Sequence, residues 1–154
     1  MTRRKVEVVL DTNMLIAGFF PGASRRIIRA WKRGDVRAVV SAAVLKEYEH
    51  IIAPLPFRKR ERDEILALVR NRMLTRTVRP SRRLRVVKED PADDKFLECA
   101  LAGKVKYLIS SDMHLKRVGR FESVEIMTPG QFVKRHLGES KTRREGNQYQ
   151  REEP

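Results

Sequence analysis

The stretch VEVVLDTNMLIAG, residues 6–18, places an aspartate directly behind a short apolar run. Residues 6–10 are apolar except for Glu7, and three of them are β-branched, which predicts a buried strand. The Asp-Thr-Asn at 11–13 is typical of a turn, so we expect the strand to run into a loop. Strand termination is a sufficient reason for Asp11, and a chemical role requires other acids to converge on it.

Length and composition limit the possible classes of protein. A chain of 154 residues with 41% hydrophobic content predicts one globular domain with a full core. The sequence has no apolar run long enough to span a bilayer and no signal-type segment, which predicts a cytoplasmic protein without a membrane partner. The single Cys99 excludes an internal disulfide, and the three scattered histidines argue against a zinc site.

The net charge of +14 predicts an anionic partner, and it favours nucleic acid over membrane because no segment resembles a basic amphipathic membrane helix. Residues 58–85 contain eleven Lys or Arg and only three acids. The alternative is a solvated helix face in an arginine-rich, heat-adapted proteome.

The remaining sequence alternates predicted strands and helices, with Ser24 and Ser41 as expected helix caps and residues 80–93 mostly loop. This order predicts a three-layer α/β/α sandwich with a mostly parallel central sheet in residues 1–137. Residues 138–154 are polar and aperiodic, which predicts a disordered tail. We expect strands at 36–41, 74–80 (an edge strand), 105–110 (a central strand) and 124–128, and helices at about 24–34, 42–53, 58–73, 91–103 and 129–137.

Two acids are expected at the same edge of this sheet. Asp11 and Asp112 each follow an apolar strand, and ligands of parallel α/β sheets bind beyond the carboxyl ends of the strands. We therefore expect both carboxylates at one rim.

Asp93 lies on the apolar face of its predicted helix, together with Phe96 and Ala100, whereas Asp94 turns toward the side that carries Glu98. A carboxylate on a buried face is costly unless donors or a cation meet it. The alternative is a helix cap, which an aspartate near a helix N-terminus supplies.

Glu47 and Glu49 lie on opposite margins of the apolar stripe of the helix at 42–53, and spacing does not choose between them. Several carboxylates at one end of a cationic protein would repel each other unless hard divalent cations held them. Ligands that are all oxygen suit Mg²⁺ or Mn²⁺.

Four segments resemble the motifs of the PIN domain family, specifically the VapC-like toxin components of toxin-antitoxin systems, over roughly residues 5–137. VVLDTNMLI (8–16) resembles the first motif, and VLKEYEH (44–50) resembles the second, which selects Glu47. DPADDKFLECALAGKVKYLISSDMHL (90–115) resembles the third block, with its acids at Asp93 and Asp112. Relatives often carry another aspartate where this chain has His114, which puts a second metal site in doubt.

The resemblance implies a Mg²⁺-dependent (or Mn²⁺-dependent) endoribonuclease that hydrolyses RNA with a metal-activated water. It also implies a type II toxin, a homodimer and an antitoxin partner. The metal ligands and catalytic residues it implies are Asp11, Glu47, Asp93 and Asp112, with Asn13 and Ser110 orienting them.

Three other functions remain open. A solitary PIN nuclease in RNA processing would use the same four acids. A basic module that binds RNA without cleaving it would use the acids as caps and strand ends. A phosphoryl-transfer enzyme would need a second acid where Thr12 and Asn13 stand, and the chain has no phosphate-binding GxxxxGK[ST] motif.

Overall fold

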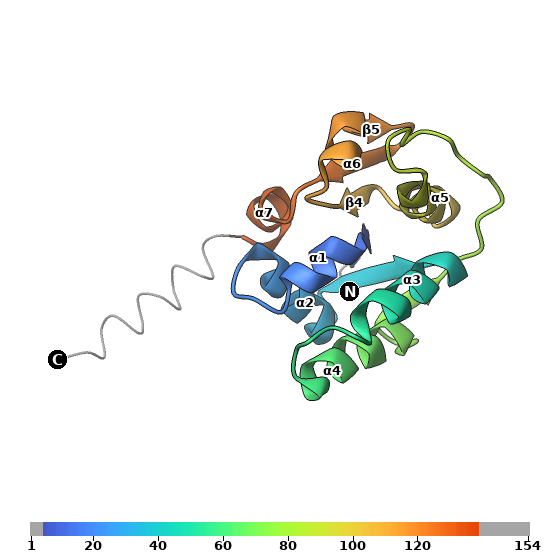
Figure 1. Cartoon of the computed structure of the whole chain (residues 1–154). Helices are drawn as coiled ribbons and strands as arrows, with labels where there is room; N and C mark the ends of the chain where they lie inside the picture. Colours follow the sequence, from blue (N-terminus) through green and yellow to red (C-terminus); the bar gives the residue numbers. More distant parts are fainter. Residues whose placement is uncertain (1–4, 139–154) are drawn as a thin grey trace.

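The computed structural model describes residues 5–138, and a six-stranded sheet forms their centre (Figure 1). All neighbouring strands pair in parallel except β5 and β6. The sheet is therefore mostly parallel, as predicted. In spatial order its strands are β3 (Thr75–Thr77), β2 (Val36–Val40), β1 (Val6–Leu10), β4 (Tyr107–Ile109), β6 (Val124–Met127) and β5 (Arg120–Phe121).

Helices cover both sides of the sheet, which confirms the predicted three-layer sandwich. In Figure 1, α2 and α7 lie to the left of the strands and α5 lies to the right. Helix α3 packs beside α5, and α4 packs against α3 and β3. The helices are α1 (Thr12–Ala17), α2 (Ala23–Arg33), α3 (Ala42–Ile52), α4 (Lys59–Arg70), α5 (Asp94–Ala102), α6 (Met113–Val118) and α7 (Pro129–Phe132), with a 3₁₀ turn η1 (Pro91–Asp93) and a π turn η2 (Val133–Leu137).

Strands β1 and β4 lie at the centre of the sheet and, apart from Glu7, are apolar on both faces, the pattern of a parallel sheet covered by helices. Their register pairs Leu10 with Ile109. The two strands therefore end side by side, and the residues that follow them start from the same rim of the sheet. Membrane-spanning helices are not found in residues 5–138, where none is both long and apolar enough.

Several predicted boundaries are wrong in detail. Helix α1 begins at Thr12, so Asp11 is a helix N-cap rather than the start of a loop. Gly22, not Ser24, occupies the N-cap position of α2. Ser41 does cap α3, since its side chain accepts from the Val44 N–H. Strand β5 and helix α6 were not predicted, and the predicted disordered tail lies outside the described residues apart from residue 138.

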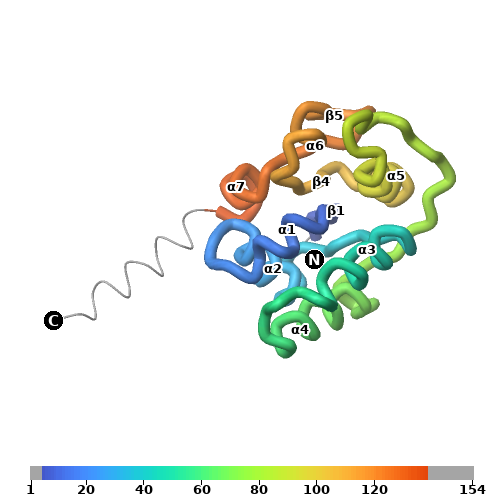
Figure 2. Tube along the Cα trace, in the orientation of Figure 1, coloured from blue at the N-terminus to red at the C-terminus, as the bar shows by residue number. Residues whose placement is uncertain are grey.

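Residues 78–90 form a long connection that passes over α5, as the green trace in Figure 2 shows. Asp94 is buried and accepts from the backbone N–H groups of Val86 and Val87, each at 3.0 Å. Glu98 accepts from the Leu84 N–H at 2.8 Å. Asp94 and Glu98 share one side of α5, as predicted, and this side anchors the connection.

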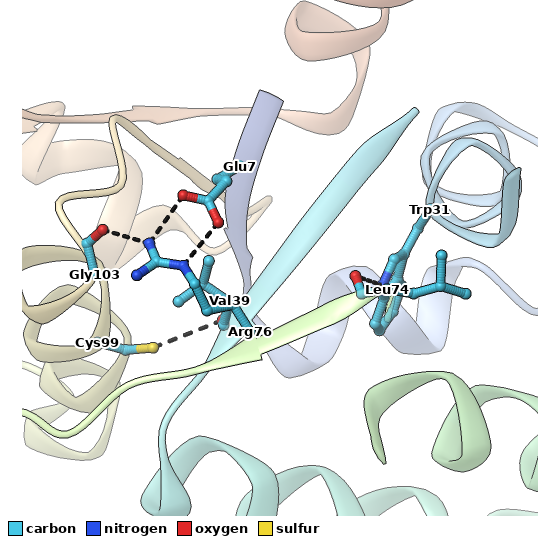
Figure 3. A network of polar contacts seen from close by, with 7 residues as sticks. All are labelled: Glu7, Trp31, Val39, Leu74, Arg76, Cys99 and Gly103. Atoms are coloured by element: carbon cyan, nitrogen blue, oxygen red, sulfur yellow. Dashed lines mark hydrogen bonds and ion pairs between the residues drawn. The ribbon is translucent and has the colours of Figure 1, made fainter. Parts of the chain in front are cut away.

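An ion pair lies across the face of the sheet that α5 covers (Figure 3). Two nitrogens of the Arg76 guanidinium, Nε and Nη2, donate to the Glu7 carboxylate at 2.8 and 2.9 Å, and Nη2 also donates to the carbonyl oxygen of Gly103. A Cβ on Gly103 would lie 3.2 Å from Arg76 Nη2 and 3.0 Å from Val39 Cγ1. The absence of a side chain therefore lets the end of α5 approach the guanidinium.

The edge strand β3 is also held from the α2 side. The indole N–H of Trp31 donates to the Leu74 carbonyl (Figure 3) and to the Thr75 hydroxyl, each at 3.1 Å. The Thr75 hydroxyl in turn donates to the Leu68 carbonyl of α4 at 2.8 Å. These bonds join α2, α4 and β3.

We predict that Arg76→Met destabilises the protein by about 1–3 kcal/mol, because it leaves the half-buried Glu7 carboxylate without its partner. Urea unfolding measures the change. Adding Glu7→Gln to Arg76→Met should recover part of the loss, and a double variant less stable than Arg76→Met would contradict this account.

Candidate active site

Asp11 is fixed at the rim where β1 and β4 end. Its backbone N–H donates to the Ile109 carbonyl at 3.1 Å, which extends the pairing of the two strands by one residue. One carboxylate oxygen accepts from the Met14 N–H at 2.7 Å, and the other accepts from the Ser110 hydroxyl. The residue is 3% exposed. All these donors are neutral, so the carboxylate keeps its charge uncompensated.

Burial raises the pKa of Asp11 to about 6 from the ordinary 3.8. The bonds from Ser110 and Met14 oppose this rise, while the Asp112 and Glu47 carboxylates add to it. Both acids are linked to Asp11 by hydrogen bonds of neighbouring residues, Asp112 through Ser110 and Glu47 through Thr12.

Ser110 connects the first and last acids. Its hydroxyl donates to Asp11 and accepts from the Asp112 N–H at 3.0 Å. Asp112 caps α6 by accepting from the His114 N–H at 2.7 Å. One oxygen of Asp112 is occupied in this way, and the residue is half-buried at the end of β4.

Glu47 reaches the site from α3. The Tyr48 hydroxyl, fully buried, donates to the Leu10 carbonyl and so holds α3 against the end of β1. The two oxygens of Glu47 accept from the Thr12 hydroxyl and from Lys95 Nζ, the latter at 2.7 Å.

Glu49 lies elsewhere, although spacing along the helix left it equivalent to Glu47. Its carboxylate accepts from two nitrogens of Arg70 on the exposed surface, at 2.6 and 3.1 Å. The structure thus brings Glu47, and not Glu49, toward Asp11.

Asp93 ends the 3₁₀ turn η1 just before α5 and is half-buried. Its Oδ2 atom is buried and has no hydrogen-bond partner within residues 5–138. Burial, followed by the charges of Asp90, Asp112, Asp11 and Glu47, raises the pKa of Asp93 to about 7. This buried carboxylate oxygen has no hydrogen-bond donor to offset the cost of burying its charge, and a bound cation would offset that cost instead.

Asp90 is an additional acid that the sequence analysis missed. One carboxylate oxygen from each of Asp90, Asp93 and Asp112 lies within 4.8 Å of the others. The only sequence signal was an Asp-Pro pair ahead of a predicted helix, which is equally typical of a loop.

A small cavity of about 160 Å³ lies among these groups. Its walls include three of the four predicted acids, Asp11, Glu47 and Asp93, while Asp112 approaches from the Asp93 side. Asn13 is exposed at the cavity wall, and within the described chain no hydrogen bond joins its side chain to the acids. The structure therefore brings the four acids and Ser110 together and places Asn13 at the edge.

The donor atoms around the cavity fit a divalent cation. They are carboxylate oxygens from separate parts of the chain, which suit Mg²⁺ or Mn²⁺. The raised pKa values of Asp11 and Asp93 and the unpartnered Asp93 oxygen indicate that negative charge is in excess here.

The fold and this site define a parallel α/β domain with an acidic site beyond the carboxyl ends of its central strands. The sequence model of the PIN domain matches residues 7–114, and the chain belongs to the PIN domain family. PIN domains are generally nucleases that use a divalent metal.

Solved structures resemble the chain at low sequence identity. The VapBC2 complex from Rickettsia felis, bound to a DNA fragment from its promoter, matches with a TM-score of 0.54 and 12% identity, over 80% of this chain and 98% of the other. FitAcB from Neisseria gonorrhoeae matches with a TM-score of 0.47 and 12% identity, over the same shares of the two chains. The comparison with curated proteins gives no match.

We predict that the metal-free protein loses stability as pH rises from about 4 to about 7. The folded state holds protons on Asp11 and Asp93 up to pKa values of about 6 and 7, whereas the unfolded chain releases them near 3.8. Asp93→Asn removes part of this cost and should raise stability at pH 8 by roughly 1–2 kcal/mol, allowing for the partial exposure of Asp93, with little change at pH 4.

Urea unfolding in EDTA at pH 4, 6 and 8 measures this difference. Asp63→Asn, on the exposed surface of α4, is the control and should follow the wild-type profile. Parallel profiles for Asp93→Asn and the wild type would show that Asp93 does not carry the excess charge.

Proposed function

We propose that this protein is a Mg²⁺-dependent (or Mn²⁺-dependent) endoribonuclease that acts as the toxin of a type II toxin-antitoxin module. The observation that carries the proposal is the convergence of acids from three separate segments around one small cavity, with Asp112 from a fourth segment beside Asp93, whose buried oxygen has no donor in residues 5–138. The residues proposed to hold the ion are Asp11, Glu47, Asp93 and Asp112.

Uncharged hydrogen-bond donors orient two of the carboxylates in this site. Ser110 and the Met14 N–H fix Asp11, and Thr12 fixes Glu47, through uncharged donors that leave the carboxylates anionic. A bound divalent ion would supply an activated water and stabilise the charge on the phosphodiester. Side-chain nucleophiles are not needed, and we expect Asn13 to contact substrate at the exposed wall.

The charge of the whole chain supports an RNA substrate. A net charge of +14 attracts a polyanion that the acidic cavity alone would repel. The exposed cations of α4 form ion pairs with acids, and exposed arginines follow this helix at Arg72, Arg79, Arg83 and Arg85. Binding should therefore weaken steeply as salt increases.

The toxin role rests on the resemblance of the four motifs to those of VapC-like proteins. The Rickettsia structure contains a VapBC2 complex with promoter DNA, and at 12% identity this likeness bears on the fold alone. An antitoxin partner and a homodimer stay predictions. Expression in a bacterial host tests the role: growth arrest that co-expression of a neighbouring reading frame relieves supports a toxin, and harmless expression favours a solitary PIN nuclease.

We predict that the purified protein cleaves single-stranded or structured RNA in Mg²⁺ or Mn²⁺ and that EDTA abolishes cleavage. Asp11→Asn should lower the cleavage rate at least about 100-fold, because it removes a charged ligand at the centre of the cluster. Gel analysis of end-labelled RNA measures the rate.

Glu49→Gln is the matched control for Glu47→Gln, since both glutamates lie on α3 two residues apart. The Glu49 variant should retain wild-type cleavage, whereas the Glu47 variant should lose it. RNA binding without cleavage in any divalent ion would support the non-catalytic module instead.

We also predict that Asp90 contributes to ion binding. Asp90→Asn should weaken Mn²⁺ affinity about tenfold, because Asp90 offers an oxygen within 4.8 Å of those of Asp93 and Asp112. Isothermal titration calorimetry measures the affinity, with Asp63→Asn as the exposed control. Equal affinities for the two variants would exclude Asp90 from the site.

A further inference from the structure

Lys95 is the cation of the acid cluster. Among residues 5–138, Glu47 is the only one of the four proposed ligands that forms an ion pair, and its partner is Lys95. Nζ of Lys95 lies 2.7 Å from one oxygen of Glu47, and the two side chains are 24% and 21% exposed. The Thr12 hydroxyl occupies the other oxygen. Both oxygens of Glu47 are therefore already engaged.

Lys95 lies on α5 between two cavities. Asp93, at the start of the same helix, lines the small acidic cavity. Lys95 also lines a larger groove of about 610 Å³ between α5 and the connection at 83–88. Arg83, Arg85 and Lys88 line this groove as exposed residues. The long, flexible lysine stem can place the ammonium on either side.

The ion pair with Lys95 has two opposing effects on the site. It offsets part of the repulsion among carboxylates that lack other cations, which stabilises the site without metal. It also competes with any divalent ion for Glu47, since an ammonium within hydrogen-bond distance occupies the oxygen and repels a second cation.

We propose that Lys95 is an exchangeable counter-ion of Glu47, which a divalent ion must displace toward the groove before Glu47 can bind it. This inference rests on the proposed function, because it concerns loading of the same site. Lys95 is on this view a positioning residue that sets metal affinity. The same contact keeps the four-acid site folded when no metal is bound.

The test measures Mn²⁺ affinity by isothermal titration calorimetry for the wild type and three variants. Lys95→Met keeps the apolar stem and removes the charge, and it should bind Mn²⁺ about two- to fivefold more tightly. Lys95→Arg keeps a cation beside Glu47 and should stay within about twofold of the wild type. Lys88→Met removes a charge from the same groove away from Glu47 and should also stay within about twofold.

Thermal unfolding gives a second readout that does not depend on activity. Without metal, Lys95→Met should melt at a lower temperature than the wild type, and saturating Mn²⁺ should remove the difference. Lys95→Gln should behave as Lys95→Met does, which separates loss of charge from a packing defect of one variant.

The outcomes separate the two proposals. Unchanged or weaker Mn²⁺ affinity in Lys95→Met, or equal tightening in Lys88→Met, overturns the exchange while leaving a metal site in place. Failure of the wild type to bind Mn²⁺ overturns the proposed function and the exchange together.

Discussion

The site depends on an electrostatic constraint, the placement of several carboxylates at one buried rim. The parallel pairing of β1 with β4 aligns Leu10 with Ile109, so the strands end together and the acids that follow them meet. The first of these, Asp11, is almost fully buried and receives only neutral donors. The raised pKa values of Asp11 and Asp93 show that neutral donors do not fully offset burial and like charge. A bound cation would therefore favour the ionised forms of Asp11 and Asp93 near neutral pH.

The two ends of α5 have different roles: one end stabilises the fold, and the other contributes to the acidic site. The helix begins next to Asp93 at the acidic rim and ends at Gly103, where the Arg76–Glu7 pair lies across the sheet. At the end near Gly103 each charge has a bidentate partner, and at the rim the charges are left in excess. The ion pair therefore stabilises the sheet and its edge strand, and the unfavourable burial of charge is confined to the rim, where the functional site lies.

Much of the site could be predicted because strand ends and helix periodicity are local properties of the sequence. Asp11 and Asp112 follow apolar strands, and Asp93 shares its helix face with Phe96. Asp90 and Lys95 could not be found this way, because their roles depend on the path of residues 78–90 over α5 and on the approach of α3. Helix α1 was missed because an Asp-Thr-Asn sequence suits a turn and an N-cap equally well.

The two cavities show why size alone does not locate the chemistry. The groove of about 610 Å³ beside α5 contains Asp94 and Glu98, whose carboxylates accept from backbone N–H groups and anchor the connection at 78–90. The cavity of about 160 Å³ contains acids whose charge is not satisfied. In residues 5–138, Lys95 is the only groove-lining residue that forms an ion pair with an acid of the smaller cavity. A polyanion bound at the cationic rim of the groove would attract the Lys95 ammonium. A divalent cation bound by the acids would replace the same ammonium at Glu47.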